Sequence, residues 1–107
     1  MATDQLTPIF AALADPTRRA ILTRLAEGEA TVNELAEPFP ITKQAVSQHI
    51  KVLERAGLVT RTRNAQLRPS RIEGAALKEA AEWLYRYRAF WDASIEQLDA
   101  RLRQRDG

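Results

Sequence analysis

Residues 41–59 constrain this chain more than any other segment, because their polar and apolar side chains separate onto two faces of one helix. At about 100° per residue, Val46, Ile50 and Leu53 fall on one side. Gly57 is placed to end the helix. Amide, hydroxyl and basic groups can contact base edges and phosphates, so the outward face has the make-up of a DNA-recognition helix. That face carries Gln44, Ser47, Gln48, Lys51 and Arg55.

The size and composition of the chain predict one domain over residues 1–107. With 107 residues, of which 45% are hydrophobic, it can build one modest core and little more. It has no cysteine, which removes disulfides and thiolate metal ligands. Because it also has no apolar leader and no apolar run that could span a bilayer, we expect a cytoplasmic protein that does not enter a membrane.

The charge is unevenly distributed. Residues 43–72 carry seven Lys and Arg against one Glu, a local charge of +6 in a chain whose total is +2. A basic block on an otherwise acidic chain is typical of a surface that binds nucleic acid.

Capping signals predict a helix-turn-helix over about residues 31–56. Thr31 and Glu34 fit a capping box, Pro38 ends that short helix, and Thr42 is a candidate N-cap for the next one. Two earlier helices are predicted to start at Thr7-Pro8 and Asp15-Pro16, because proline is favoured at the first helical position.

The segment from about 58 to 72 predicts a two-stranded wing. Residues 58–63 favour a strand, residues 67–72 could return beside it, and Asn64-Ala65 is the candidate turn. Pro69 cannot donate to a ladder, so the second strand must be an edge strand or be interrupted there. The expected fold is mainly α with a small two-stranded β wing: a winged helix-turn-helix with a long C-terminal helix.

The C-terminal region predicts one long amphipathic helix over about residues 75–103, since it contains neither Gly nor Pro. Its apolar stripe is longer than a helix-turn-helix of this size can cover, which favours dimerisation. The first helix is the expected companion surface. The residues expected at the dimer interface are Leu6, Ile9, Phe10, Leu84, Tyr87, Trp91, Ile95, Leu98 and Leu102.

Three segments together resemble the ArsR family of small winged-helix bacterial repressors. They are residues 10–22, residues 46–59 and the aromatic-rich residues 79–91, and the likeness covers nearly the whole chain. The resemblance implies a homodimer, joined through its first and last helices, that binds a pseudo-palindromic operator on double-stranded DNA and blocks transcription.

The family's DNA-facing positions can be carried over to this chain. Lys51 is added to them because it lies on the polar face of the helix described above. Lys43 stands where many members have Gln, so an operator sequence cannot be borrowed from a relative. The expected DNA-binding residues are Thr42, Lys43, Gln44, Ser47, Gln48, Lys51, Arg61, Arg63 and, as a further candidate, Arg68.

Metal sensing, known for this family, is not expected here. Residues 32–37 offer no thiolate, and the last helix offers Asp92, Glu96 and Asp99 without a histidine. The resemblance is therefore to a branch without metal ligands, and we expect no cofactor. His49 is the only histidine. We expect it to be partly buried, bonded to backbone or touching a phosphate, and we expect no catalytic site.

Two alternatives remain open from the sequence. The winged helix could be a protein-protein interaction module whose basic block binds an acidic partner, although such a helix usually presents an apolar anchor. The protein could also be a small-molecule-responsive repressor with an aromatic pocket at the dimer interface. A repressor of this kind could also respond to an unidentified small-molecule or protein effector. The candidate pocket residues are Trp83, Tyr85, Tyr87, Phe90 and Trp91.

Overall fold

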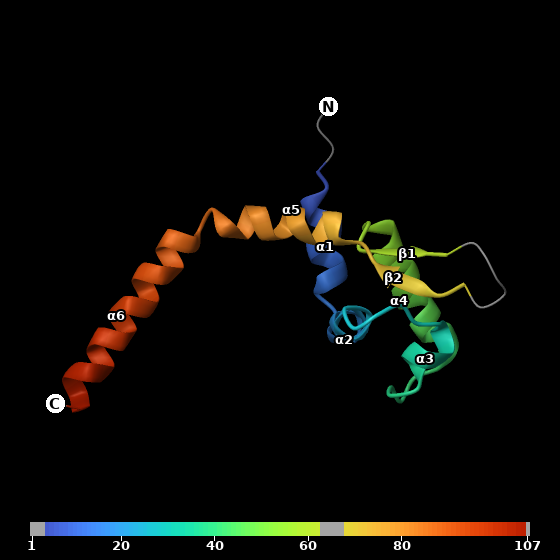
Figure 1. The fold of residues 1–107 in the computed structure, drawn as a ribbon, viewed down its shortest axis with the longest axis horizontal. Coiled ribbons are helices and arrows are strands. Elements are labelled where there is room, and N and C mark those ends of the chain that lie inside the picture. The colour runs from blue at the N-terminus through green and yellow to red at the C-terminus, as the bar shows by residue number, and fades with distance from the viewer. Residues whose placement is uncertain (1–3, 63–67, 107) are drawn as a thin grey trace.

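The computed structural model describes residues 4–62 and 68–106 and has a mainly helical fold with one small sheet (Figure 1). This confirms the predicted fold class. The elements follow the order α1 (Leu6–Leu13), α2 (Pro16–Leu25), α3 (Val32–Ala36), α4 (Lys43–Arg55), β1 (Val59–Arg61), β2 (Ser70–Ile72), α5 (Gly74–Tyr85) and α6 (Arg88–Asp106).

Three of the predicted helix caps are present, at Asp15, Thr31 and Thr42. The Asp15 carboxylate accepts from the N–H of Arg18 at 3.0 Å, with Pro16 at the first helical position. The Thr31 hydroxyl oxygen accepts from the N–H of Glu34 at 3.2 Å and completes the capping box. These side chains satisfy backbone donors that a helix start otherwise leaves free.

The start predicted for the first helix was wrong. Thr7 lies inside α1, and its hydroxyl hydrogen-bonds to the carboxylate of Asp4. That carboxylate also accepts from the N–H groups of Leu6 at 3.1 Å and of Thr7 at 3.2 Å. A carboxylate that accepts from two backbone donors satisfies this helix start better than the Thr7 hydroxyl could.

The core lies between α1, α2, α3, α4, the start of the wing and α5. Its largest members, including Ile21, Leu35, Ile50 and Leu58, are fully buried, and Ala80 of α5 closes one side. Ile9 was expected at the dimer interface, but only 2% of it is exposed. The prediction for Ile9 was wrong because the inward face of α1 is covered by the chain's own core.

The wing is a two-stranded antiparallel sheet in which Val59 pairs with Ile72 and Arg61 pairs with Ser70. On its other side, Ser70 exchanges two backbone hydrogen bonds with Ala30, at 3.0 and 2.8 Å. β2 is therefore not an edge strand at Ser70. Pro69 precedes β2, and its carbonyl accepts from the N–H of Thr62 at 3.0 Å, so its missing donor interrupts no ladder. The candidate turn at Asn64-Ala65 lies outside the described residues.

The C-terminal region forms two helices, so the prediction of one continuous helix over 75–103 was wrong. α5 ends at Tyr85 and α6 begins at Arg88. The N–H groups of Arg86 and Tyr87 bond to the carbonyls of Trp83 and Leu84, three residues back, at 3.3 and 3.0 Å. This tighter turn breaks the α-helical ladder without Gly or Pro, and beyond it no core surface holds the helix in line.

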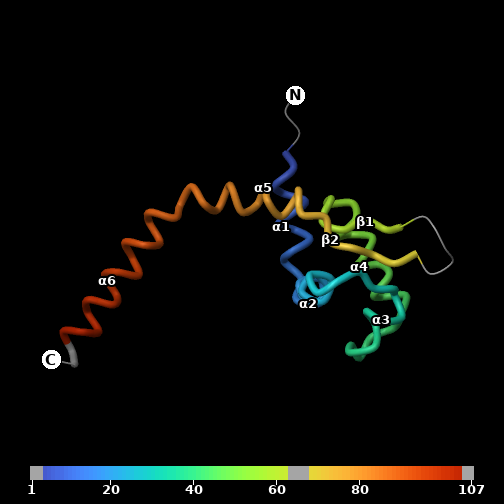
Figure 2. The backbone as a smooth tube through the Cα atoms, in the orientation of Figure 1, coloured from blue at the N-terminus to red at the C-terminus, as the bar shows by residue number. Residues whose placement is uncertain are grey.

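α6 projects away from the rest of the molecule (Figures 1 and 2). The radius of gyration is 18.3 Å, whereas a compact chain of this length has about 13 Å. In Figure 1 the end of α6 and the wing lie at opposite ends of the long axis. The chain therefore has a compact body, which includes the helix-turn-helix, and an arm whose described side chains are all exposed.

Candidate nucleic-acid interface

The two faces of α4 differ sharply in exposure, as the sequence predicts. Val46, Ile50 and Leu53 are fully buried. Ser47 is half-buried because it sits at the border between the faces. The helix presents a continuous polar surface made of Thr42, Lys43, Gln44, Gln48 and Lys51, all exposed.

Both ends of α4 are fixed by local hydrogen bonds. At the start, the Thr42 side chain accepts from the N–H of Ala45 at 3.0 Å. At the end, Gly57 has a φ of +79°, and the N–H of Leu58 reaches the Leu53 carbonyl at 2.9 Å. The N–H of Gly57 also reaches the Glu54 carbonyl at 3.0 Å, which completes a Schellman motif. The chain turns directly from α4 into the wing.

The wing places its basic residues in different settings. Arg61 lies in β1 and is half-buried, and its Nε has no hydrogen-bond partner among the described residues. Arg68 is exposed with a φ of +41°. Arg63 lies outside the described residues. Arg71 of β2, which the sequence analysis did not select, is exposed and donates to the Thr60 hydroxyl at 3.2 Å. Because Arg71 belongs to the basic block of residues 43–72, the sequence could have identified it as a candidate DNA-binding residue.

His49 lies against the start of α2. Its Nδ1 atom is 4.0 Å from a carboxylate oxygen of Asp15 and 3.4 Å from a guanidinium nitrogen of Arg18. The sequence analysis expected a backbone or phosphate contact, but the observed neighbours are these two side chains. No sequence spacing could have identified them, because they come from a different helix.

Two of the carboxylates that cap helices are held in their ionised form. The N–H of Arg18 lowers the pKa of Asp15, and the nearby His49 lowers it further. Backbone and side-chain hydrogen bonds from Thr31 lower the pKa of Glu34, with a smaller effect from Arg24. These interactions favour the charged capping groups at neutral pH.

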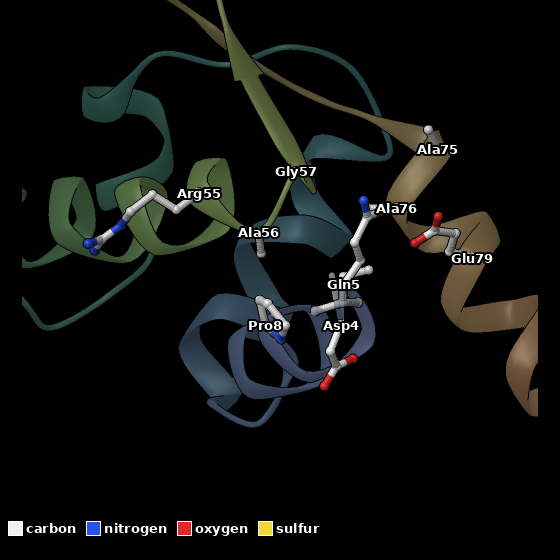
Figure 3. A pocket seen from close by; sticks show the side chains of 10 residues that line it. Asp4, Gln5, Pro8, Arg55, Ala56, Gly57, Ala75, Ala76 and Glu79 are labelled. Carbon is white, nitrogen blue, oxygen red and sulfur yellow. The ribbon is translucent and has the colours of Figure 1, made fainter. Parts of the chain in front are cut away.

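A cavity of about 440 Å³ lies between the start of α1, the end of α4 and the start of α5 (Figure 3). Small residues such as Ala56, Gly57 and Ala76 form part of its wall. Figure 3 shows Glu79 on α5 and Arg55 on α4 at separate sides, with the Arg55 guanidinium directed away. No aromatic side chain lines this cavity.

Apart from Ile9, which is buried, the residues expected at a dimer interface fall into two groups. Leu6, Phe10 and Leu84 are half-buried at the junction of α1 and α5, where the Phe10 ring lies 5.6 Å from the Trp83 ring. The others are exposed to between 45% and 64% of their surface. They follow the break or lie on α6: Tyr87, Trp91, Ile95, Leu98 and Leu102.

Within residues 4–62 and 68–106, no three or more His, Cys, Asp and Glu side chains are grouped as metal ligands. None of the helices in the same part of the chain is long and apolar enough to cross a bilayer.

The architecture and the α4 surface define a winged helix-turn-helix domain of the DNA-binding class. A helix-turn-helix domain model matches residues 13–62. The transcriptional repressor SdpR of Bacillus subtilis is 32% identical over 79 residues, which cover 74% of this chain and 88% of SdpR. The chain belongs to the ArsR family of transcriptional regulators, which is not a family of enzymes.

Solved structures agree with this assignment. The crystal structure of the ArsR family transcriptional regulator RHA00566 has a TM-score of 0.75 at 40% identity, covering 83% of this chain and 98% of that one. The homodimeric domain of Mb0332 from Mycobacterium bovis has a TM-score of 0.64 at 28% identity, covering 88% and 84%. This chain spans only about half the length of several other curated relatives. Among the curated relatives, SmtB of Mycobacterium tuberculosis is named as a repressor and HlyU of Vibrio cholerae as an activator.

Proposed function

We propose that this protein is a dimeric transcriptional repressor of the cytoplasm that binds a pseudo-palindromic operator, with α4 in the major groove. The observation that carries the proposal is the division of α4 into a fully buried face and an exposed polar face. A helix held this firmly on one side can present the other side to the groove of a duplex without rearrangement.

The polar face suggests a division of labour. Gln44 and Gln48 can pair with adenine edges, and Ser47 can donate to or accept from either base. Basic side chains bind phosphates and set the orientation of the protein on the duplex. The residues proposed for phosphate contact are Lys43, Lys51, Arg61, Arg63 and Arg68, with Thr42 beside them at the start of the helix.

The proposed partner for α1, α5 and α6 is a second copy of the chain. The exposed residues Trp91, Ile95, Leu98 and Leu102 are spaced four, three and four apart, so they lie along one side of α6. An apolar stripe of this length is costly to leave in water. The homodimeric relative supports a symmetric pairing, in which two copies of α4 contact two half-sites.

We assign the protein to a branch of the family that does not use metal. The chain has no cysteine and one histidine, and that histidine lies beside Asp15 and Arg18 rather than in a group of ligands. Borderline metals such as zinc prefer imidazole and thiolate donors.

The test is fluorescence anisotropy of the purified protein on tiled duplexes from upstream of its own gene, with scrambled duplex as control, across a salt series. A tile that binds on the order of 10³-fold tighter than the scrambled duplex supports the proposal and supplies the operator. Weak and equal binding to all tiles contradicts autoregulation. If duplexes from more distant promoters also bind no more tightly than the scrambled duplex, the protein-protein interaction module becomes the better hypothesis.

A further inference from the structure

Arg18 of α2 links the end of α1 to the recognition helix. Its Nε donates to the Ala12 carbonyl at 2.6 Å, and a terminal nitrogen donates to the Ala11 carbonyl at 3.1 Å. These carbonyls lie in the last turn of α1, and that of Ala11 also accepts from the N–H of Ala14 at 3.2 Å. The other terminal nitrogen lies 3.4 Å from Nδ1 of His49. One guanidinium therefore contacts both a helix of the proposed dimer surface and the helix proposed to enter the groove.

The Nδ1 atom of His49 has two competing partners. Besides Arg18, it faces a carboxylate oxygen of Asp15 at 4.0 Å. A guanidinium only donates hydrogen bonds, so Arg18 can bond to Nδ1 only when that atom is unprotonated. Once the ring carries a proton on both nitrogens, Nδ1 becomes a donor that suits Asp15, and the positive charge of the ring repels Arg18. The protonation state of the ring thus decides which side chain at the start of α2 it pairs with.

The other charged groups around α4 are already engaged or belong to other surfaces. α1 contains no ionisable side chain. Arg19 of α2 donates to the Leu13 carbonyl at 2.8 Å, and Glu34 of α3 is bound to Thr31 and lies 3.9 Å from Arg24. Arg61 of β1 forms no ion pair among the described residues. Asp15 and Arg18 are therefore the groups with which a proton on His49 interacts directly.

We propose that His49 is a proton-controlled positioning residue for α4. In the neutral tautomer with its proton on Nε2, it accepts from Arg18 at Nδ1 and completes a polar link from α1 through α2 to α4. In its protonated form it pairs with Asp15 and that link opens. This inference rests on the proposed DNA-binding function, because the purpose of the link is to hold α4 in its binding position.

The experiment compares operator affinity at pH 7.5 and pH 5.5 for the wild type and for His49→Asn. Asparagine places an amide oxygen near the position of Nδ1, so it can accept from Arg18 at both pH values. We expect the wild type to bind about fivefold more weakly at pH 5.5, equivalent to losing one net hydrogen bond, while the variant changes less than twofold. Equal pH dependence in both proteins overturns the proposal. Tighter wild-type binding at pH 5.5 also overturns it, because it would identify His49 as a phosphate contact.

A second arm needs no DNA. Since the chain has one histidine, NMR reports its titration as a single ring resonance. The midpoint should move to higher pH in Arg18→Gln, which removes the neighbouring cation, and to lower pH in Asp15→Asn, which keeps a capping side chain. Backbone amides at the end of α1 should shift with the same midpoint in the wild type and stay constant in His49→Asn. If no duplex binds at either pH, the proposed function fails, and these shifts alone decide whether the link exists.

Discussion

Leu58 donates its backbone N–H to the carbonyl of Leu53 at 2.9 Å, and this bond lies where α4 ends and the chain enters the wing. Both residues are fully buried, so the junction is anchored in the core. The two surfaces proposed to contact DNA are thereby held at a fixed relative orientation. Gly57 makes the turn possible because its φ of +79° is a conformation that residues with a Cβ adopt at a cost.

Gly57→Ala should destabilise the fold by about 1–2 kcal/mol, the cost of the left-handed conformation for a residue with a Cβ. The structure offers space, because a Cβ at this position would lie 3.8 Å from the Ala76 Cβ, an ordinary contact. The cost is therefore conformational and not steric. Urea unfolding at fixed protein concentration measures it. Gly28→Ala, at a second glycine of positive φ with open space around it, is the comparison. An unchanged midpoint for Gly57→Ala would contradict the role given to this turn.

Gln44→Ala and Ser47→Ala should reduce discrimination between operator and scrambled duplex, with a loss of about 1–3 kcal/mol for a residue that makes a bidentate base contact. Lys51→Ala and Arg68→Ala should instead weaken binding to both duplexes and lower the salt slope by about 1. All four side chains lie outside the core, so the variants should fold. Anisotropy on both duplexes across a salt series separates the classes. Equal effects from all four variants would refute the division of labour.

Leu98→Glu should shift the protein from dimer to monomer, because it places a charge in the apolar stripe of α6. Ala93→Glu is the matched control: it adds the same carboxylate to the same helix, on the side away from the stripe. Sedimentation velocity over a concentration range measures the change. Dimers of equal strength in both variants would show that α6 is not part of the interface.

Glu34 should contribute stability that is lost in acid. Hydrogen bonds from Thr31 lower the pKa of Glu34 below its usual value. Its contribution is therefore fully present above the unfolded pKa, about 4.3, and disappears as the pH falls through the folded one. Glu34→Gln keeps an acceptor for the capping box but does not titrate. Thermal unfolding from pH 6 to pH 3 should show the wild-type advantage over Glu34→Gln shrinking below about pH 4. A constant difference would exclude this linkage.

Local signals allowed much of the fold to be predicted from the sequence. Asp15, Thr31 and Thr42 cap helices by contacts within three residues, and spacing alone identifies such contacts. The buried face of α4 was predicted in the same way, from the helical spacing of its apolar residues. Features that depend on distant parts of the chain were missed: the pairing of Ser70 with Ala30, and the position of His49 beside α2.

The C-terminal region shows where composition misleads. The absence of Gly and Pro removes the usual reasons for a helix to stop, but it does not supply the packing that keeps a long helix straight. At Arg86 and Tyr87 the ladder shortens to three-residue bonds, and α6 leaves the body. Aromatic contacts span this turn: the Trp83 and Tyr87 rings lie 5.3 Å apart, and the Arg88 guanidinium lies 5.1 Å from the centre of the Tyr85 ring.

The separation of the two faces of α4 also bears on how such a protein can evolve. Val46, Ile50 and Leu53 keep the helix in place, while Gln44 and Gln48 take almost no part in the packing of the chain. Substitutions at the outward positions should therefore leave folding nearly untouched. A duplicated copy of the gene could acquire a new target sequence through a few changes on this surface, and each intermediate would remain a folded protein.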